Sequence, residues 1–325
     1  MPKPRVAVLL AAHWPGPELE QQLQTILGQL RVDVRLYVGH DTGPASKTST
    51  AGTEGSAHET ALRQRLALPS VRLVYHEAIG CAAQNFFRLI RSVDFSRYDW
   101  VALSDQDDLW HPDKLQRAIQ VLTAQPEAQG YSANVSTFRG HPDQSAYHTH
   151  PVPGADSVSP ELANTIVKSQ PQRRYDHFFE AAGPGCTYVI SRRLALALQA
   201  WLVEQPDDRL STVRRHDWLI YAWARTQGYG WQIDPRVVLD YRQHGRNVVG
   251  AHLGWSASMA RLQQVRQGWF RSQVLAVAQL VDPQGPVVRG LESGSRWRRL
   301  VLGWQGRRRL RDRLALCAFV LVGWV

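Results

Sequence analysis

The first 125 residues alternate short apolar runs with segments whose apolar side chains recur every three or four positions. The apolar runs, each expected to form a strand, lie at residues 5–12, 32–38, 71–75 and 99–104. The segments with helical spacing lie at residues 19–30, 84–92 and 112–122. Strands that alternate with helices predict an α/β fold, with a doubly wound, Rossmann-like and mostly parallel sheet flanked by helices.

Two acidic turns follow strands of this predicted sheet. Asp41 follows the second strand, and the sequence Asp105-Gln106-Asp107-Asp108 follows the fourth. Ligands of such sheets bind in the crevice at the carboxyl ends of the strands. We therefore expect both turns at the edge of the sheet where a ligand binds.

The middle of the chain has a weaker pattern. Residues 125–175 are rich in His, Pro, Ser and Gln, which predicts long loops. Residues 183–190 form a turn that enters another strand, and Ser191 is placed to cap the helix that follows. A further helix, rich in aromatic residues, is expected to open at Asp217.

Composition excludes several classes of protein. With 325 residues, 44% of them hydrophobic, the chain can bury a sizeable core, which excludes a largely disordered protein. Its three cysteines lie far apart and form no CxxC pair, which favours a reducing compartment over a disulfide framework or a thiolate zinc site. The first apolar run ends at His-Trp-Pro and lacks a small-residue cleavage site, so we interpret it as a strand and expect a cytoplasmic protein.

The net charge of +10 is concentrated near the C-terminus. Residues 289–313 contain nine arginines against two acidic residues, and an apolar run of 12 residues follows at 314–325. A spanning helix needs about 20 apolar residues, so arginines with tryptophans here favour a helix on the anionic inner face of the cytoplasmic membrane. The alternatives are a helix docked on the rest of the chain and a contact with a partner protein. No nucleic acid is expected, because no zinc or aromatic-interleaved motif accompanies the arginines.

The turn at residues 105–108 has three carboxylates in four positions. Close carboxylates repel one another, so a fold that keeps them together is expected to supply a cation. Hard oxygen ligands suit Mg²⁺ or Mn²⁺. The alternative is a solvated turn in which an aspartate caps the next helix.

The string SDQDDLW at residues 104–110, with Pro112, Lys114 and Leu115 after it, closely resembles the signature of bacterial family 2 glycosyltransferases. The string YRQHG at residues 241–245 is similar to a second motif of that family. Further matches in the family's order are Val6–Gln29, Gly80 with Asn85-Phe86, Gly185-Cys186-Thr187 and His216-Asp217-Trp218. The resemblance covers about residues 5–251. The family that the chain resembles includes rhamnosyltransferases and other enzymes of surface-polysaccharide assembly.

This resemblance implies a GT-A fold and a metal-dependent, inverting glycosyltransferase. Such an enzyme moves a hexose or deoxyhexose from a nucleotide-diphosphate sugar, here expected to be a UDP- or dTDP-sugar. The implied acceptor is a saccharide or lipid-linked saccharide of a bacterial lipopolysaccharide, capsule or exopolysaccharide.

The resemblance also implies roles for individual residues. Asp217 is expected to be the general base that takes the proton of the acceptor hydroxyl. Asp107 and His244 are expected to hold Mn²⁺ or Mg²⁺. The residues expected at the donor are Ala12, Asp41, Asn85, Asp105 and Gln106. The residues expected on the acceptor side are Gly185, Cys186, His216 and Trp218. Without the resemblance, a plain helix N-cap is the favoured interpretation of Asp217.

Two segments depart from the family pattern. Ala12-His13-Trp14-Pro15 stands where relatives carry Thr-Tyr-Asn-Gly, and His40-Asp41-Thr42-Gly43 stands where they carry a DDGS-type turn that holds the nucleotide. A protonated histidine cannot reproduce the acceptor pattern of a carboxylate, so the identity of the nucleotide stays open. Two other functions also stay open: a non-catalytic, membrane-associated relative that binds sugar nucleotides or glycans, and a metal-dependent phosphohydrolase.

The predicted organisation is a GT-A glycosyltransferase domain over residues 1–255 and a basic helical extension over residues 256–325. Within the domain, residues 1–125 are expected to bind the nucleotide sugar and residues 126–255 the acceptor.

Overall fold

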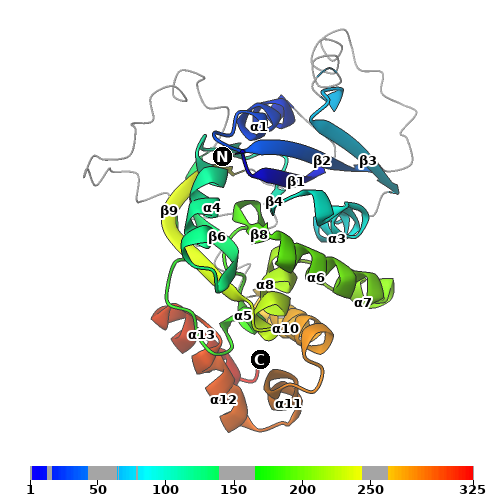
Figure 1. Cartoon of the computed structure of the whole chain (residues 1–325). Coiled ribbons are helices and arrows are strands. Elements are labelled where there is room, and N and C mark those ends of the chain that lie inside the picture. The colour runs from blue at the N-terminus through cyan, green and yellow to red at the C-terminus, as the bar shows by residue number, and fades with distance from the viewer. Residues whose placement is uncertain are drawn as a thin grey trace, which may run out of the picture.

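The computed structural model describes residues 2–12, 17–42, 64, 66–77, 80–138, 165–243 and 263–324. This part of the chain has an α/β fold in which helices flank one mixed sheet and further helices gather at the C-terminal end (Figure 1). The strands are β1 (Arg5–Ala12), β2 (Asp33–Thr42), β3 (Val71–Glu77), β4 (Trp100–Ser104), β5 (Leu109–Trp110), β6 (Ala128–Phe138), β7 (Thr165–Ile166), β8 (Val189–Ser191) and β9 (Gly230–Arg242). The predicted fold class is confirmed.

The order of the strands in the sheet is β3-β2-β1-β4-β8-β6-β9-β5, and β7 pairs with β6. Neighbours β3, β2, β1 and β4 are parallel, and so are β6 and β9, whereas β8 and β5 are antiparallel to their neighbours. Since β2 and β4 run in the same direction, their carboxyl ends lie at the same edge of the sheet, as the sequence predicts. The expectation that Asp41 lies in a turn after the second strand is wrong, because β2 extends to Thr42 and pairs Asp41 with β3; residues 43–63 lie outside the described residues.

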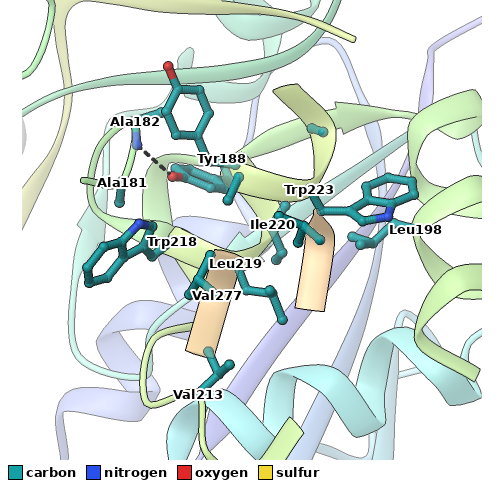
Figure 2. Close-up of a cluster of buried hydrophobic side chains, with 14 of the residues drawn as sticks. Ala181, Ala182, Tyr188, Leu198, Val213, Trp218, Leu219, Ile220, Trp223 and Val277 are labelled. Carbon is teal, nitrogen blue, oxygen red and sulfur yellow. Dashed lines mark hydrogen bonds between the residues drawn. The ribbon is translucent and has the colours of Figure 1, made fainter. Parts of the chain in front are cut away.

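The helices cover both faces of the sheet. They are α1 (Pro17–Leu27), α3 (Ala82–Ser92), α4 (Lys114–Ala124), α5 (Asp176–Phe179), α6 (Arg192–Glu204), α7 (Asp207–Ser211), α8 (His216–Thr226), α10 (Trp269–Val281), α11 (Pro286–Glu292), α12 (Arg296–Gln305) and α13 (Leu310–Leu321). One apolar core lies between the sheet and α1 with α4. The other, larger core joins the sheet to α3, α6, α8 and α10, and Figure 2 shows its centre around Tyr188, Trp218 and Trp223.

The expectation of long loops over residues 125–175 is wrong for β6, which is an inner strand of the sheet. Its pattern was obscured by buried polar side chains that find partners far along the chain. Asn134 donates to the carbonyl of Pro235 at 2.7 Å and accepts from the backbone N–H of Lys168 at 2.7 Å. Ser132 accepts from the indole N–H of Trp231 at 3.1 Å. Paired in this way, polar residues occupy a core strand without an unsatisfied group.

Three consecutive C-terminal arginines, Arg307, Arg308 and Arg309, bind groups elsewhere in the chain, and Arg309 does so at the carbonyl of Val167. The guanidinium of Arg308, which is fully buried, lies 3.0 Å from Asp176 and 3.3 Å from Glu180, and it donates to the carbonyl of Ala181 at 2.6 Å. Arg307 also donates to the carbonyl of Phe179 at 2.8 Å. Residues 307–309 therefore dock on the rest of the chain, which is one of the two alternatives to membrane contact. Only part of the arginine cluster faces solvent.

Within the described residues, no helix has the length and hydropathy that a membrane span requires.

Candidate active site

The acidic turn between β4 and β5 is held from one side by polar residues of α1. Gln22 is buried and donates to the hydroxyl of Ser104 at 2.7 Å and to the carbonyl of Asp105 at 3.2 Å. One turn later, the hydroxyl of Thr25 accepts from the backbone N–H of Trp110 at 3.2 Å. These residues are spaced to lie on one face of the helix, so α1 fixes both ends of the turn.

Arg242, at the end of β9, holds the same turn from the other side. Its Nε donates to the carbonyl of Asp107 at 2.9 Å, and its Nη2 donates to the side chain of Gln21 at 2.8 Å. Its backbone N–H donates to the fully buried carboxylate of Asp108 at 3.4 Å. Asp108 is therefore a structural member of the turn, and Arg242 connects the turn to the last strand of the sheet.

The carboxylates of the turn are crowded. Burial, together with the charges of Asp107 and Asp217, raises the pKa of Asp105 to about 7. Burial and the charges of Asp107 and Asp105 raise the pKa of Asp108 well above its usual value. A site that concentrates negative charge in this way favours a cation.

Oxygen ligands for a divalent ion are present in this turn. Ligand atoms of Asp105, Asp108 and Cys186 lie within 4.8 Å of one another. Burial and the nearby charges of Asp108 and Asp105 raise the pKa of the Cys186 thiol well above its usual value, so it stays protonated. A protonated thiol is a poor ligand for Mg²⁺ or Mn²⁺, whereas the carboxylates fit such an ion.

Lys114 places an amine beneath the same turn. The side chain is fully buried, and its Nζ lies 3.2 Å from the centre of the Trp110 ring. Burial lowers the pKa of this amine and the charge of Asp108 offsets part of that effect, which leaves the pKa at about 7. The amine therefore lies close enough to the buried carboxylate of Asp108 to offset part of its charge.

Asp217 lies at the start of α8, near the turn. Its Oδ2 is 2.9 Å from Nη2 of Arg215, and its Oδ1 accepts from the backbone N–H of Trp218 at 2.8 Å. Burial would raise the pKa of Asp217, but Arg215, His216 and these hydrogen bonds outweigh burial and lower it. Asp217 is thus a buried, ionised carboxylate.

The N-cap interpretation of Asp217 is wrong. The capping position of α8 is Arg215, and Asp217 lies within the first turn of the helix, where a carboxylate also interacts favourably with the helix dipole.

Gly185 and His216 pack tightly beside Asp217. A Cβ atom at Gly185 would lie 2.3 Å from Nε2 of His216 and 3.2 Å from Cβ of Asp217, so only glycine fits there. The His216 ring stacks on Phe86, with ring centres 3.9 Å apart. Burial lowers the pKa of His216 to about 4, which keeps the ring neutral at physiological pH.

Comparison with known proteins decides the family. The chain is 32% identical over 309 residues to the dTDP-rhamnosyl transferase RfbG of Shigella flexneri, and the match covers 94% of this chain and 96% of that relative. The chain belongs to this family of glycosyltransferases. No family model matches the sequence.

One solved structure shows the fold of the glycosyltransferase, and a second is less similar. The mannosyltransferase PcManGT from Pyrobaculum calidifontis, solved in complex with GDP-Man and Mn²⁺, has a TM-score of 0.50 and 18% identity, over 99% of this chain and 76% of its own. The S. aureus TarS 1-349 structure in complex with UDP has a TM-score of 0.48 and 12% identity, over 98% of this chain and 92% of its own. The recognition as a glycosyltransferase with a GT-A-like fold is confirmed.

The glycosyltransferase places the expected site residues in different surroundings. Asp105, Gln106, Asp107 and Cys186 lie in or against the acidic turn, and Gly185, His216 and Asp217 meet next to it. Trp218 lies in the core, where its indole N–H donates to the carbonyl of His177 at 3.1 Å. His244 and the side chain of Asp41 lie outside the described residues.

Asn85 and Ala12 connect two strands of the glycosyltransferase. The Asn85 amide is buried and donates to the carbonyls of Gly39 at 2.7 Å and of Ala12 at 3.4 Å. It therefore ties the ends of β1 and β2 together at the edge expected to bind the donor. Their direct role at the donor stays a prediction.

Three residues of the site were not singled out as functional from the sequence: Lys114, Arg215 and Arg242. Lys114 and Arg242 belong to the motif strings that carry the family resemblance, and Arg215 directly precedes the His-Asp-Trp string. The hydrogen-bond partners of Arg242 are 134 to 221 residues away, and the roles of Lys114 and Arg215 require a known fold and a known helix start, so position in or beside a motif was the only signal available.

We expect the substitution Asp105→Asn to stabilise the metal-free protein at pH 8. Because the pKa of Asp105 is raised from 3.8 to about 7, this carboxyl favours folding at acid pH and loses that contribution as pH rises through about 7. The gain should reach up to about 3 kcal/mol at pH 8 and be smaller at pH 5. Thermal melts in EDTA at both pH values measure it. Asp208→Asn, at an exposed position of α7, is the control, and an equal gain at pH 5 and pH 8 would contradict the crowding argument.

Proposed function

We propose that this glycosyltransferase moves a deoxyhexose or hexose from a nucleotide-diphosphate sugar to a saccharide or lipid-linked saccharide acceptor. The Shigella relative is a dTDP-rhamnosyl transferase by name, which supports dTDP-rhamnose as the first donor to test, with UDP-sugars next. The single observation that carries the proposal is that Gly185 and Cys186 join Asp217 to the acidic turn: a Cβ atom at Gly185 would lie 3.2 Å from Cβ of Asp217, and the thiol of Cys186 lies within 4.8 Å of ligand atoms of Asp105 and Asp108. The acceptor is proposed to be a growing bacterial surface glycan, such as lipopolysaccharide, capsule or exopolysaccharide.

We propose that Asp107 and Asp105, with His244, hold Mn²⁺ or Mg²⁺. The support is the crowding of carboxylates in this turn: the charge of Asp107 helps to raise the pKa of Asp105, and ligand atoms of Asp105, Asp108 and Cys186 lie within 4.8 Å of one another, a group that does not include Asp107. When bound, the cation supplies positive charge that stabilises the departing nucleotide diphosphate.

Asp217 is the proposed general base. An ionised carboxylate next to the donor edge can accept the proton of an acceptor hydroxyl as that hydroxyl attacks the sugar. Arg215 and Trp218 occupy part of its acceptor capacity, and a carboxylate has about four lone-pair sites, so at least one remains for the acceptor. Attack on the face opposite the diphosphate would invert the anomeric configuration in one step.

We also propose a cytoplasmic location and a division of the chain into two parts. Cys81, Cys186 and Cys317 are all free thiols, which fits a reducing compartment such as the cytoplasm. We retain residues 1–255 as the glycosyltransferase domain and residues 256–325 as its helical extension.

The experiment is a donor panel of dTDP-rhamnose, UDP- and GDP-sugars with Mn²⁺, Mg²⁺ or EDTA, with release of nucleotide diphosphate as the readout. We expect release from one donor, stimulated by a divalent ion, and a loss of at least about 100-fold in Asp107→Ala. Asp208→Ala is the matched control, because Asp208 is exposed and lies on α7. Donor-specific binding without release, in the presence of acceptor, would instead identify a non-catalytic sugar-nucleotide binder.

A further inference from the structure

Helices α12 and α13 form a hairpin that exposes large apolar side chains. On α12 these side chains are spaced by four and three residues, and on α13 by four and seven, so each set lies along one side of its helix. Trp297 is the most exposed of them, at 74%. We call this set the hairpin face, and it consists of Trp297, Val301, Trp304, Leu310, Leu314 and Leu321.

The hairpin face is the side of each helix that the protein leaves uncovered. The opposite side of α12 is buried: Leu302 packs towards Gly290, and Gly303 lies against Leu316 and Cys317 of α13. The guanidinium of Arg313, the residue before Leu314, lies 4.6 Å from the ring centre of Trp304, so the exposed row of α12 borders α13 beside Leu314. We therefore treat the six side chains as one surface.

Exposed arginines border this surface. Arg296 and Arg298 flank Trp297 in sequence, on the two sides of the apolar row of α12, and Arg311 follows Leu310. Arg311 lies 3.4 Å from Asp312, which it shares with Arg307, so one acidic group serves two arginines. The border of the hairpin face carries an excess of positive charge.

We propose that the hairpin face lies on a bilayer of anionic phospholipids. Tryptophan and leucine enter the boundary between headgroups and acyl chains, and the bordering arginines meet the lipid phosphates. A second copy of this chain is a poorer occupant, since it would bring the same arginines together. An RNA or DNA strand would match the charge but leave the six apolar side chains in water. The proposal does not depend on which sugar, if any, the active site transfers.

The test is flotation of the full chain with vesicles of phosphatidylcholine alone or with 30% phosphatidylglycerol. One arginine near an anionic surface contributes about 1 kcal/mol, or about fivefold in binding. We therefore expect binding only to the anionic vesicles, about 100-fold weaker binding for the triple variant Arg296→Gln, Arg298→Gln, Arg311→Gln, and at least tenfold weaker binding for Trp297→Ser with Leu314→Ser.

Matched controls separate the hairpin face from general charge and apolarity. Arg31, Arg72 and Arg97 are exposed elsewhere, and so are Leu30 and Val203. The corresponding Gln and Ser variants should bind the vesicles like the wild type. All the altered positions are solvent-exposed, so unchanged thermal melting serves as the check on folding. The proposal is overturned if the anionic vesicles do not bind the wild type, if the hairpin variants bind them equally well, or if the hairpin variants instead dissolve a dimer seen by light scattering.

Discussion

The substitution Asp217→Asn is expected to lower kcat by about a thousandfold, within the range of ~10²–10⁴ that a positioned general base contributes. The amide keeps the size of the carboxylate and still accepts from Trp218, but it cannot take a proton from the acceptor. Donor binding should stay within about twofold, because Asp217 lies beside the acidic turn and not in it. The measurement is nucleotide-diphosphate release with the donor and acceptor of the wild type, together with the donor Kd by calorimetry.

Asp208→Asn provides the control for this loss of activity, since it makes the same change at an exposed site. A kcat that stays near the wild-type value in Asp217→Asn would remove Asp217 as the base. If the variant then hydrolysed the donor to nucleoside monophosphate and sugar 1-phosphate with no acceptor present, the protein would be a phosphohydrolase that uses the acidic turn alone.

The substitution Arg308→Met is expected to lower the free energy of unfolding by about 3–5 kcal/mol, the range for removing one partner of a buried ion pair. Asp176 and Glu180 would remain buried without the guanidinium that now lies between them. Burial alone would raise the pKa of Asp176, yet His177, whose Nδ1 lies 3.8 Å from the carboxylate, and the charges of Arg308 and Arg225 hold it low. Urea denaturation at pH 7 measures the loss.

Arg311→Met is the matched control, because Arg311 is exposed and its ion pair with Asp312 faces water. It should change stability by less than about 0.5 kcal/mol. A second control replaces the charged set together, as Arg308→Met with Asp176→Leu and Glu180→Met, and should recover part of the stability. Equal stability of Arg308→Met and wild type would mean that the buried ion pair does not stabilise the docking of the C-terminal helices.

The parallel half of the sheet was predictable because its signals are local. The predicted strands at residues 5–12 and 99–104 and the helix at 84–92 agree closely with β1, β4 and α3, whose apolar residues face the core with little interruption. Ser191 also caps α6 as predicted, through its bond from the N–H of Leu194. In these elements, pattern and burial coincide.

The other half of the sheet could not be predicted in the same way. β6 and β9 pair with each other across about 100 residues and carry buried polar side chains that only this pairing satisfies. Asp234 of β9, for example, is buried because Arg117 and the hydroxyl of Tyr131 bind its carboxylate at 2.8 and 3.0 Å. When its partners are unknown, an aspartate in a sequence predicts an exposed loop.

The candidate site shows the same division. Motif strings identified the acidic turn and Asp217. They did not identify the cationic side chains of Arg215, Lys114 and Arg242, because these residues reach the carboxylates or their turn only in the folded protein. The C-terminal arginines look alike in the sequence but lie in two environments. Arg308 is buried in an ion pair, whereas Arg296 and Arg298 face solvent.

The order of synthesis has a consequence for the acidic turn. Its closing residue, Arg242, is added 135 residues after Asp107, which at ~5–20 residues per second is about 7 to 27 seconds later. Until then the turn lacks the hydrogen bonds that Arg242 makes to Asp107 and Asp108. A nascent or truncated chain that ends before β9 therefore has an acidic turn that α1 can hold through Gln22 but that Arg242 cannot close.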